Sequence, residues 1–301
     1  MTEAVGRTVA GSAGAVPEQG PRAAGRPAAR RFDGYGVLIT GAGRGIGEAT
    51  ARRLAAEGAR VLVTDVDGGR AEASAARVRE ATGGTAEPLV CDVADEESVE
   101  GAVAFAVERF GSLEVLVNNA LSCTPEPALP EEVRYENWYR DLEITLTGAF
   151  RCSRAALPHL AAAGGRGTIV NIGSVNGEQD FGNHAYSAAK AGLASLTRTL
   201  AVQSAERGVR VNLIAPGTVS TPNWAGREAD LERAAKLYPL GRVGLPDDIA
   251  AAVAFLASTD ASWVTGITLP VDGGLLVSNL GLRRVLSTDG APSTGSVPPT
   301  D

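Results

Sequence analysis

Short runs of branched apolar residues alternate with longer Ala-rich stretches along most of the chain. Apolar runs without polar alternation are typical of strands buried on both faces of a parallel sheet. We expect strands at Val37–Thr40, Val61–Asp65, Pro88–Cys91, Val115–Asn118, Thr168–Ile172, Val209–Leu213 and Ile267–Val271. The stretches between them predict helices that start near Gly45, Gly69, Asp95, Glu136, Tyr186 and Pro246. This order predicts a single α/β domain with a doubly wound parallel sheet of the Rossmann type, which binds ligands at the carboxyl ends of its strands.

The two ends of the chain differ from this pattern. Residues 1–31 are rich in Ala, Gly, Pro and Arg and lack apolar periodicity, which predicts a disordered N-terminal extension. The Arg30-Arg31 pair also fits a twin-arginine signal, but the apolar run that follows is better explained as a strand. We expect residues 281–301, which are rich in Ser, Thr and Pro, to form a flexible tail. The folded domain is therefore expected to span residues 32–280.

Composition and charge narrow the possible functions. The chain has 301 residues, of which 44% are hydrophobic and 21% charged, as in an ordinary soluble globular protein. A formal net charge of −7 weighs against binding to nucleic acid or to a membrane surface. No apolar run approaches the roughly 18 residues that a membrane span needs.

The cysteines and histidines argue against metal and hydrolase chemistry. Cys91, Cys123 and Cys152 are scattered, which predicts reduced thiols in a cytoplasmic protein. Together with His159 and His184 they cannot build an ordinary zinc site, so no metal is expected. A Ser-His-Asp hydrolase is disfavoured for the same shortage of histidine.

A glycine-rich loop follows the first predicted strand. Residues 40–47 read TGAGRGIG and lead from that strand into the first predicted helix. Glycines let the backbone approach a pyrophosphate closely, and the helix N-terminus presents free N–H groups to it. The loop therefore predicts a dinucleotide site formed by Gly41, Gly43, Arg44, Gly45, Ile46 and Gly47.

The ends of the next strands predict which dinucleotide binds. Asp65 ends the second predicted strand, where a carboxylate accepts hydrogen bonds from the ribose hydroxyls and repels a 2′-phosphate. This position favours NAD over NADP. Arg44 is the counter-argument, because a guanidinium in the loop could bind that phosphate. The third and fourth strand ends add the expected cofactor contacts Asp92, Val93, Asn119 and Ala120.

Tyr186 and Lys190 are four residues apart at the start of an Ala-rich stretch, so a helix places them on one face. A free tyrosine has a pKa near ~10, and a nearby ammonium lowers it toward the range useful for acid–base catalysis. Ser174 follows the fifth predicted strand at the same sheet edge. We expect Tyr186 to exchange a proton with the substrate oxygen that Ser174 holds. His184 is more consistent with loop packing than with catalysis.

These residues together resemble the short-chain dehydrogenase/reductase family, in its branch of single-domain enzymes of about 250 residues. The resemblance covers Phe32 to Leu276 and rests on TGAGRGIG, NNA, YSAAK, PGTVST and VDGG. It implies hydride transfer between NAD(H) and a small secondary alcohol or ketone, with Tyr186 and Lys190 also contacting the cofactor. It implies further cofactor contacts from Pro216, Gly217, Val219 and Thr221.

The same resemblance implies a homotetramer or homodimer, formed through the helices near Glu136–Leu160 and Tyr186–Arg207. It also indicates the substrate pocket, which the loop Glu178–His184 and a lid at Pro222–Leu240 should line. Trp224 and Tyr238 in the lid fit a pocket wall and plain packing equally well.

Two positions depart from the family pattern. Leu121 follows NNA where the family usually has glycine, which adds bulk beside the nicotinamide. Thr145 stands where the family has a catalytic asparagine, which helps to hold a water largely through its backbone carbonyl. Threonine keeps that carbonyl and can bond the helix backbone with its hydroxyl, so we expect Thr145 to support catalysis. The alternative is a cofactor-binding member without net redox activity, such as a non-redox lyase or isomerase, or an assembly subunit.

Overall fold

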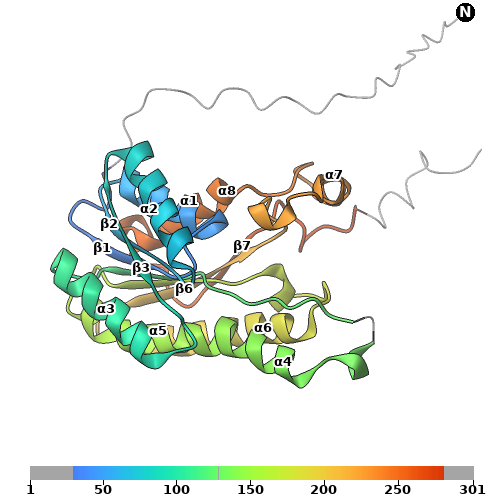
Figure 1. Ribbon diagram of the computed structural model, residues 1–301, viewed down its shortest axis with the longest axis horizontal. Helices are drawn as coiled ribbons and strands as arrows, with labels where there is room; N and C mark the ends of the chain where they lie inside the picture. Colours follow the sequence, from blue (N-terminus) through green and yellow to red (C-terminus); the bar gives the residue numbers. More distant parts are fainter. Residues whose placement is uncertain (1–29, 128, 281–301) are drawn as a thin grey trace, which may run out of the picture.

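A seven-stranded parallel sheet forms the centre of the molecule, with the strand order β3-β2-β1-β4-β5-β6-β7 (Figure 1). The computed structural model describes residues 30–127 and 129–280. The strands are β1 (Gly36–Ile39), β2 (Arg60–Asp65), β3 (Thr85–Val90), β4 (Val115–Asn118), β5 (Thr168–Ile172), β6 (Arg210–Pro216) and β7 (Thr268–Val271). All seven expected strands are confirmed. The largest shifts are of three residues: β3 begins at Thr85, which pairs with Arg60 of β2, and β6 ends at Pro216, which pairs with Val271 of β7.

Helices cover both faces of the sheet (Figure 1). On one face lie α1 (Gly45–Ala56), α2 (Gly68–Thr82) and α8 (Pro246–Ala257). On the other face lie α3 (Glu96–Phe110), α4 (Tyr135–Leu142), α5 (Gly148–Ala161) and α6 (His184–Ala205). The doubly wound α/β architecture expected from the sequence is thus confirmed. Among the described residues, no helix combines the length and apolar character needed to cross a membrane.

Short elements fill several of the connections. These are η1 (Pro130–Glu132), η2 (Glu143–Thr147), η3 (Val175–Gly177), η4 (Pro222–Trp224), α7 (Glu228–Ala235) and η5 (Thr259–Ala261). The stretch expected to be one helix from Glu136 is divided by η2, a π-helical turn between α4 and α5. Its widened spacing is seen at Gly148, whose N–H donates to the carbonyl of Glu143. Such turns are frequent at functional sites, and this one contains Thr145.

Apolar side chains fill the space on both sides of the sheet. Along β1, Val37 and Ile39 join the cluster beneath α1 and α8, whereas Leu38 joins the cluster beneath α3 and α5. Successive side chains of a strand point to opposite faces, so a strand covered on both faces must be apolar throughout. This requirement explains the uninterrupted apolar runs in the sequence.

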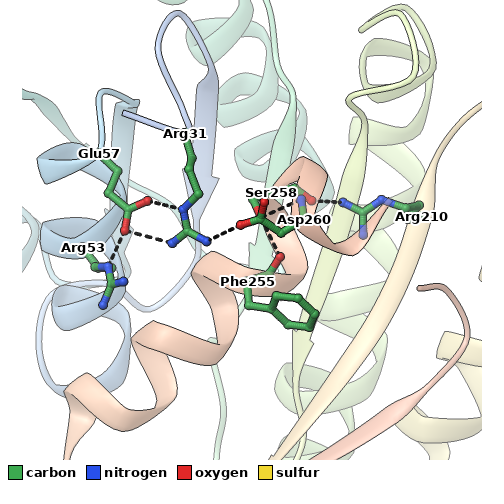
Figure 2. Close-up of polar contacts among 7 residues, drawn as sticks. All are labelled: Arg31, Arg53, Glu57, Arg210, Phe255, Ser258 and Asp260. Carbon is green, nitrogen blue, oxygen red and sulfur yellow. Dashed lines mark hydrogen bonds and ion pairs between the residues drawn. The ribbon is translucent and has the colours of Figure 1, made fainter. Parts of the chain in front are cut away.

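An ion-pair network links Arg31, near the start of the described residues, to the end of α1 and to η5 (Figure 2). The guanidinium of Arg31 contacts the Glu57 carboxylate at 2.6 Å and that of Asp260 at 3.0 Å. Arg53 holds the other Glu57 oxygen at 2.5 Å. Arg31, which the sequence prediction placed in the extension, thus joins α1 to the turn after α8. Apart from Arg30 and Arg31, the predicted extension and tail lie outside the described residues.

We expect Arg31→Ala to destabilise the protein. Glu57 is 3% exposed; burial alone would raise its pKa, but hydrogen bonds from Arg31 and Arg53 outweigh burial and lower it. This carboxylate therefore stabilises the fold above its ordinary value of 4.5, and the contribution is lost as the pH falls through the folded-state pKa. Urea denaturation of the variant at pH 7 should show a loss of about 1–3 kcal/mol.

The matched control is Arg30→Ala, because Arg30 makes only an exposed ion pair with Asp33 among the contacts described. Its urea midpoint should stay close to that of the wild type. Equal midpoints for both variants would show that the Arg31 network does not stabilise the domain.

Candidate active site

The carboxyl ends of the strands surround a cavity of about 650 Å³. It lies where the strand order reverses between β1 and β4, the position at which open α/β sheets bind ligands. Ten residues expected to bind the cofactor lie in its walls: Gly41, Arg44, Gly45, Ile46, Asp65, Asp92, Val93, Asn119, Ala120 and Thr221. Wall residues not expected to bind it are Val66, Arg70, Cys91, Ala94, Leu121, Ser122, Cys123, Arg140, Ile144, Pro222 and Asn223.

The loop between β1 and α1 fits a dinucleotide pyrophosphate. Arg44 is the N-cap of α1 and makes no side-chain cap, so the first N–H groups of the helix face the cavity without a side-chain partner from the cap. The loop is also packed too tightly for larger residues. A Cβ on Gly43 would lie 2.5 Å from Asp65 Oδ2, and one on Gly47 would lie 2.7 Å from the Cα of Ala42.

Asn119 ties this glycine loop to the end of β4. Its side-chain Nδ2 donates to the carbonyls of Thr40 and Gly41, both at 2.8 Å. In return, the Thr40 hydroxyl oxygen accepts from the backbone N–H groups of Asn119 and Ala120 at 3.0 Å. The Asn119 amide therefore holds the glycine loop in its conformation. Its position in the sequence did not indicate this role.

The site around Asp65 combines a carboxylate with a guanidinium. Asp65 Oδ2 accepts from the N–H of Gly43 at 3.1 Å, and Oδ1 lies 2.6 Å from Nη2 of Arg70. Arg70 lines the same cavity, with 38% of its side chain exposed. Sequence reasoning missed Arg70, although a basic residue soon after an acidic strand end is a visible signal. Its charge partly neutralises the carboxylate.

The segment Pro216–Thr221 reaches the cavity only at its end. Pro216 is the last residue of β6, and Val219 forms an isolated bridge with Gly244. Gly217 packs on the ring of Tyr238, since a Cβ there would lie 3.0 Å from the Tyr238 oxygen. Thr221 therefore lines the cavity, whereas the other expected members of this segment support it from outside.

The substrate loops contain ordered elements. The segment expected as a lid folds into η4 and α7. Within it, Tyr238 is 4% exposed and its hydroxyl oxygen accepts from the N–H of Thr218 at 2.6 Å, which favours packing over a wall position. The guanidinium of Arg227 lies 4.5 Å from the ring of Trp224. At the first residue of α6, Nδ1 of His184 lies 2.6 Å from a carboxylate oxygen of Glu126.

Ser174, Tyr186 and Lys190 come together beside the cavity. Ser174 follows β5; its hydroxyl donates to Asn176 Oδ1 at 3.1 Å and interacts with the phenol of Tyr186. Lys190 Nζ donates to the carbonyl of Ile172 at 2.5 Å and lies 5.4 Å from the centre of the Tyr186 ring. The thiol of Cys123, in the cavity wall, is close enough to influence the pKa of both Tyr186 and Lys190.

The sequence predicted that Lys190 lowers the pKa of Tyr186. In the folded chain this prediction is wrong, because the pKa is raised. Burial raises the pKa of Tyr186 to about 12, and the hydrogen bond from Ser174 only partly offsets it. Burial also lowers the pKa of Lys190 to about 7, so the amine carries only part of a charge at neutral pH. The sequence argument counted the attraction between the pair and omitted the cost of desolvating both.

Thr145 holds a loop with its hydroxyl. Thr145 is 1% exposed; its Oγ1 donates to the carbonyl of Ser122 at 3.1 Å and accepts from the Ser122 N–H at 3.0 Å. We had expected this hydroxyl to bond its own helix backbone. It instead fixes the chain directly after β4, next to Leu121, which is 46% exposed at the cavity.

The polar groups around the cavity differ from a set of metal ligands. Within residues 30–127 and 129–280, no three or more His, Cys, Asp and Glu side chains are grouped so that they could hold a metal ion. The cavity instead offers glycines, helix N–H groups and the Asp65 carboxylate, a set suited to a nucleotide.

Comparison with known proteins assigns the family. The family model described as "Enoyl-(Acyl carrier protein) reductase" matches residues 41–276. The cis-4-hydroxycyclohexanecarboxylate dehydrogenase of Sinomonas cyclohexanicum is 47% identical over 240 residues, which are 79% of this chain and 95% of that protein. The 3beta-hydroxysteroid dehydrogenase 1 of Eggerthella lenta is 42% identical over 249 residues, covering 80% of this chain and 94% of that protein.

A solved structure agrees with these matches. The crystal structure of levodione reductase superimposes with a TM-score of 0.77 at 37% sequence identity, covering 82% of this chain and all of that one. Fold and site define a nicotinamide-dependent oxidoreductase of the alcohol dehydrogenase or ketoreductase type. The chain belongs to the short-chain dehydrogenase/reductase family. These relatives give no support to the alternative of a member without redox activity.

We expect Lys190→Met to stabilise the protein in the absence of nucleotide. Because the pKa of Lys190 is lowered from 10.5 to about 7, the unfolded chain binds more protons between these values, and stability rises with pH in this window. Methionine removes the cost of burying the amine. Thermal unfolding at pH 7 should show a gain of about 1–3 kcal/mol, which shrinks toward pH 10.

Lys236→Met is the control for this prediction, because Lys236 is exposed. It should leave the melting temperature nearly unchanged at both pH values. A lower melting temperature for Lys190→Met at pH 7 would mean that the amine contributes more through its bond to Ile172 than its burial costs.

Proposed function

We propose that the protein transfers a hydride between NAD(H) and a cyclic secondary alcohol or ketone, with Tyr186 exchanging the proton. The observation that carries this proposal is the grouping of Ser174, Tyr186 and Lys190 beside a cavity suited to a dinucleotide. The bound nicotinamide would accept the hydride from the carbinol carbon in oxidation and return it to the carbonyl carbon in reduction. Both curated relatives described above carry names of hydroxylated ring compounds, which supports a cyclic substrate.

The roles of the three residues follow from their surroundings. Ser174 would orient the substrate oxygen by a hydrogen bond, since its hydroxyl interacts with the phenol of Tyr186. With a raised pKa, Tyr186 is protonated at neutral pH and suited to give its proton to the alkoxide that forms when a ketone is reduced. Oxidation needs the phenolate, so its rate should rise with pH. A protonated Lys190 would stabilise that phenolate.

The cofactor contacts proposed for this chain are the predicted residues of the glycine loop, the strand ends and Thr221. Lys190 and Tyr186 would face the nicotinamide ribose, and Asp65 the adenosine ribose. Thr145 is proposed to support the relay of protons through its backbone, since its hydroxyl is occupied by Ser122. Apolar wall residues Leu121 and Ile144 suit a hydrocarbon ring.

We further propose that residues 32–280 form the catalytic domain, between the extension 1–31 and the tail 281–301. Assembly into a homodimer or homotetramer through Glu136–Leu160 and Tyr186–Arg207 is supported by large apolar side chains exposed on these helices: Tyr139 (64%), Phe150 (45%) and Val202 (78%). A cytoplasmic location is supported by three free thiols, at Cys91, Cys123 and Cys152.

Tyr186→Phe tests the catalytic assignment, because it removes one oxygen and little volume. On a cyclic secondary alcohol selected from a panel by nicotinamide absorbance, turnover should fall by at least ~10²-fold, the usual effect of losing a general acid or base. The dissociation constant of NADH, measured by fluorescence, should change less than about threefold, or ~0.6 kcal/mol. A variant that keeps most of its turnover would move the proton transfer to another group, with His184 as the first candidate.

We expect NAD(H) to bind at least tenfold more tightly than NADP(H), about 1.4 kcal/mol, because Asp65 repels a 2′-phosphate. Arg70 reduces this repulsion through its contact with Asp65. Arg70→Gln should therefore widen the preference by weakening NADPH binding. Dissociation constants of the wild type that are equal, or lower for NADPH, would assign the 2′ position to Arg44 and Arg70.

A further inference from the structure

Helix α6 carries Tyr186 and Lys190 but begins without a local cap. Asn183 occupies the N-cap position, yet its side chain makes no capping hydrogen bond. Its φ of 62° lies in the left-handed region, which residues other than glycine rarely adopt. The first N–H groups of any helix lack partners within the helix and need acceptors from elsewhere. Something outside the helix must therefore hold its first turn.

Glu126 supplies these acceptors from 58 residues earlier in the chain. One of its carboxylate oxygens, Oε2, accepts from the N–H of His184 at 2.6 Å, and Oε1 accepts from the N–H of Ala185 at 3.2 Å. The same Oε2 lies 2.6 Å from Nδ1 of the His184 ring. The Glu126 side chain is 11% exposed. A carboxylate here is stabilised both by these donors and by the positive end of the helix dipole.

The other end of the same loop is also fastened. The Asp141 carboxylate accepts from the Ser122 hydroxyl at 2.6 Å, from the Thr124 N–H at 2.9 Å and from the Thr124 hydroxyl at 2.7 Å. Thr145 binds the backbone of Ser122. Ser122 and Cys123 lie in the cavity wall. The loop after β4 thus connects the cavity wall with the first turn of the helix that carries the catalytic tyrosine.

We infer that Glu126 is a positioning residue, which caps α6 from the loop after β4 and thereby fixes Tyr186 relative to the cavity wall. Tyr186 directly follows Ala185, whose N–H the carboxylate holds. The phenol must keep hydrogen-bond distance both to Ser174 and to the substrate oxygen, so a shift of the first turn by even about 1 Å would slow proton transfer. This inference rests on the proposed role of Tyr186.

Two Glu126 variants distinguish the hydrogen bonds that the side chain accepts from the effect of its charge. Glu126→Ala removes both acceptors, whereas Glu126→Gln keeps one carbonyl oxygen in place without the charge. Glu131→Ala is the matched control, since Glu131 is exposed in the same connection between β4 and α4. All variants would be made in the full chain and compared by thermal unfolding.

The first readout is amide hydrogen exchange at His184–Ser187, which does not depend on activity. Exchange in Glu126→Ala should be about tenfold faster, the effect expected from losing a cap. Glu126→Gln should restore most of the protection, and Glu131→Ala should match the wild type. The second readout is steady-state kinetics: kcat of Glu126→Ala should fall at least about tenfold, with the NADH dissociation constant unchanged. Glu126→Gln should recover most of that kcat.

Each outcome of these measurements tests one part of the inference. Unchanged exchange in Glu126→Ala would overturn the cap itself. Faster exchange with unchanged kcat would show a purely structural cap and overturn the positioning role. An equal loss of kcat in Glu131→Ala would do the same, because the effect would not be specific to Glu126. A wild-type protein that binds NADH but turns over no alcohol or ketone would contradict the proposed function, while the exchange measurement would still decide whether Glu126 caps α6.

Discussion

The junction between the ends of β1 and β4 fixes the position of every other part of the site. Asn119 and Thr40 exchange hydrogen bonds across it, so the glycine loop after β1 and the loop after β4 are held as one unit. The dinucleotide cavity opens at this junction because the strand order reverses there. On the β4 side, Thr145 and Asp141 hold the loop by hydrogen bonds to Ser122 and Thr124. The loop then continues toward the first turn of α6. The glycine loop and the first turn of α6 are therefore both hydrogen-bonded to the segment after β4.

Burial sets the protonation of Tyr186 and Lys190, the residues proposed for catalysis, and for the amine it carries a cost. The amine of Lys190 donates to the carbonyl of Ile172 and is completely enclosed, and this burial lowers its pKa to about 7. Tyr186 is enclosed as well, and its pKa is raised to about 12. The buried amine is unfavourable for folding at neutral pH, but a dry site suits catalysis, because a proton or charge added to it has a large effect on its neighbours. The apolar clusters on both faces of the sheet provide the stability that offsets this cost.

The sequence predicted most of the fold, and it singled out the candidate residues that the fold brings to the carboxyl ends of the strands, because both depend on local patterns. The strands are centred on short apolar runs, such as Gly36–Ile39 of β1, and the glycine loop connects this strand to the first helix. Arg70, Cys123 and Glu126 were not foreseen, since each acts on a partner that only the folded chain brings close. The pKa of Tyr186 was expected in the wrong direction, because spacing along a helix reports proximity to Lys190 and says nothing about solvent.

By itself the sequence determined the class of the protein: a parallel α/β sheet, a dinucleotide loop, and a tyrosine and lysine one helical turn apart. These features follow from periodicity, glycine content and spacing, which are properties of neighbouring residues. The tertiary structure decided how those parts are coupled. It divided the helix around Thr145 with a π-helical turn, turned the Thr145 hydroxyl toward Ser122, and brought Glu126 to the start of α6. Burial and contacts between distant segments set these features, and neither can be derived from a short stretch of sequence.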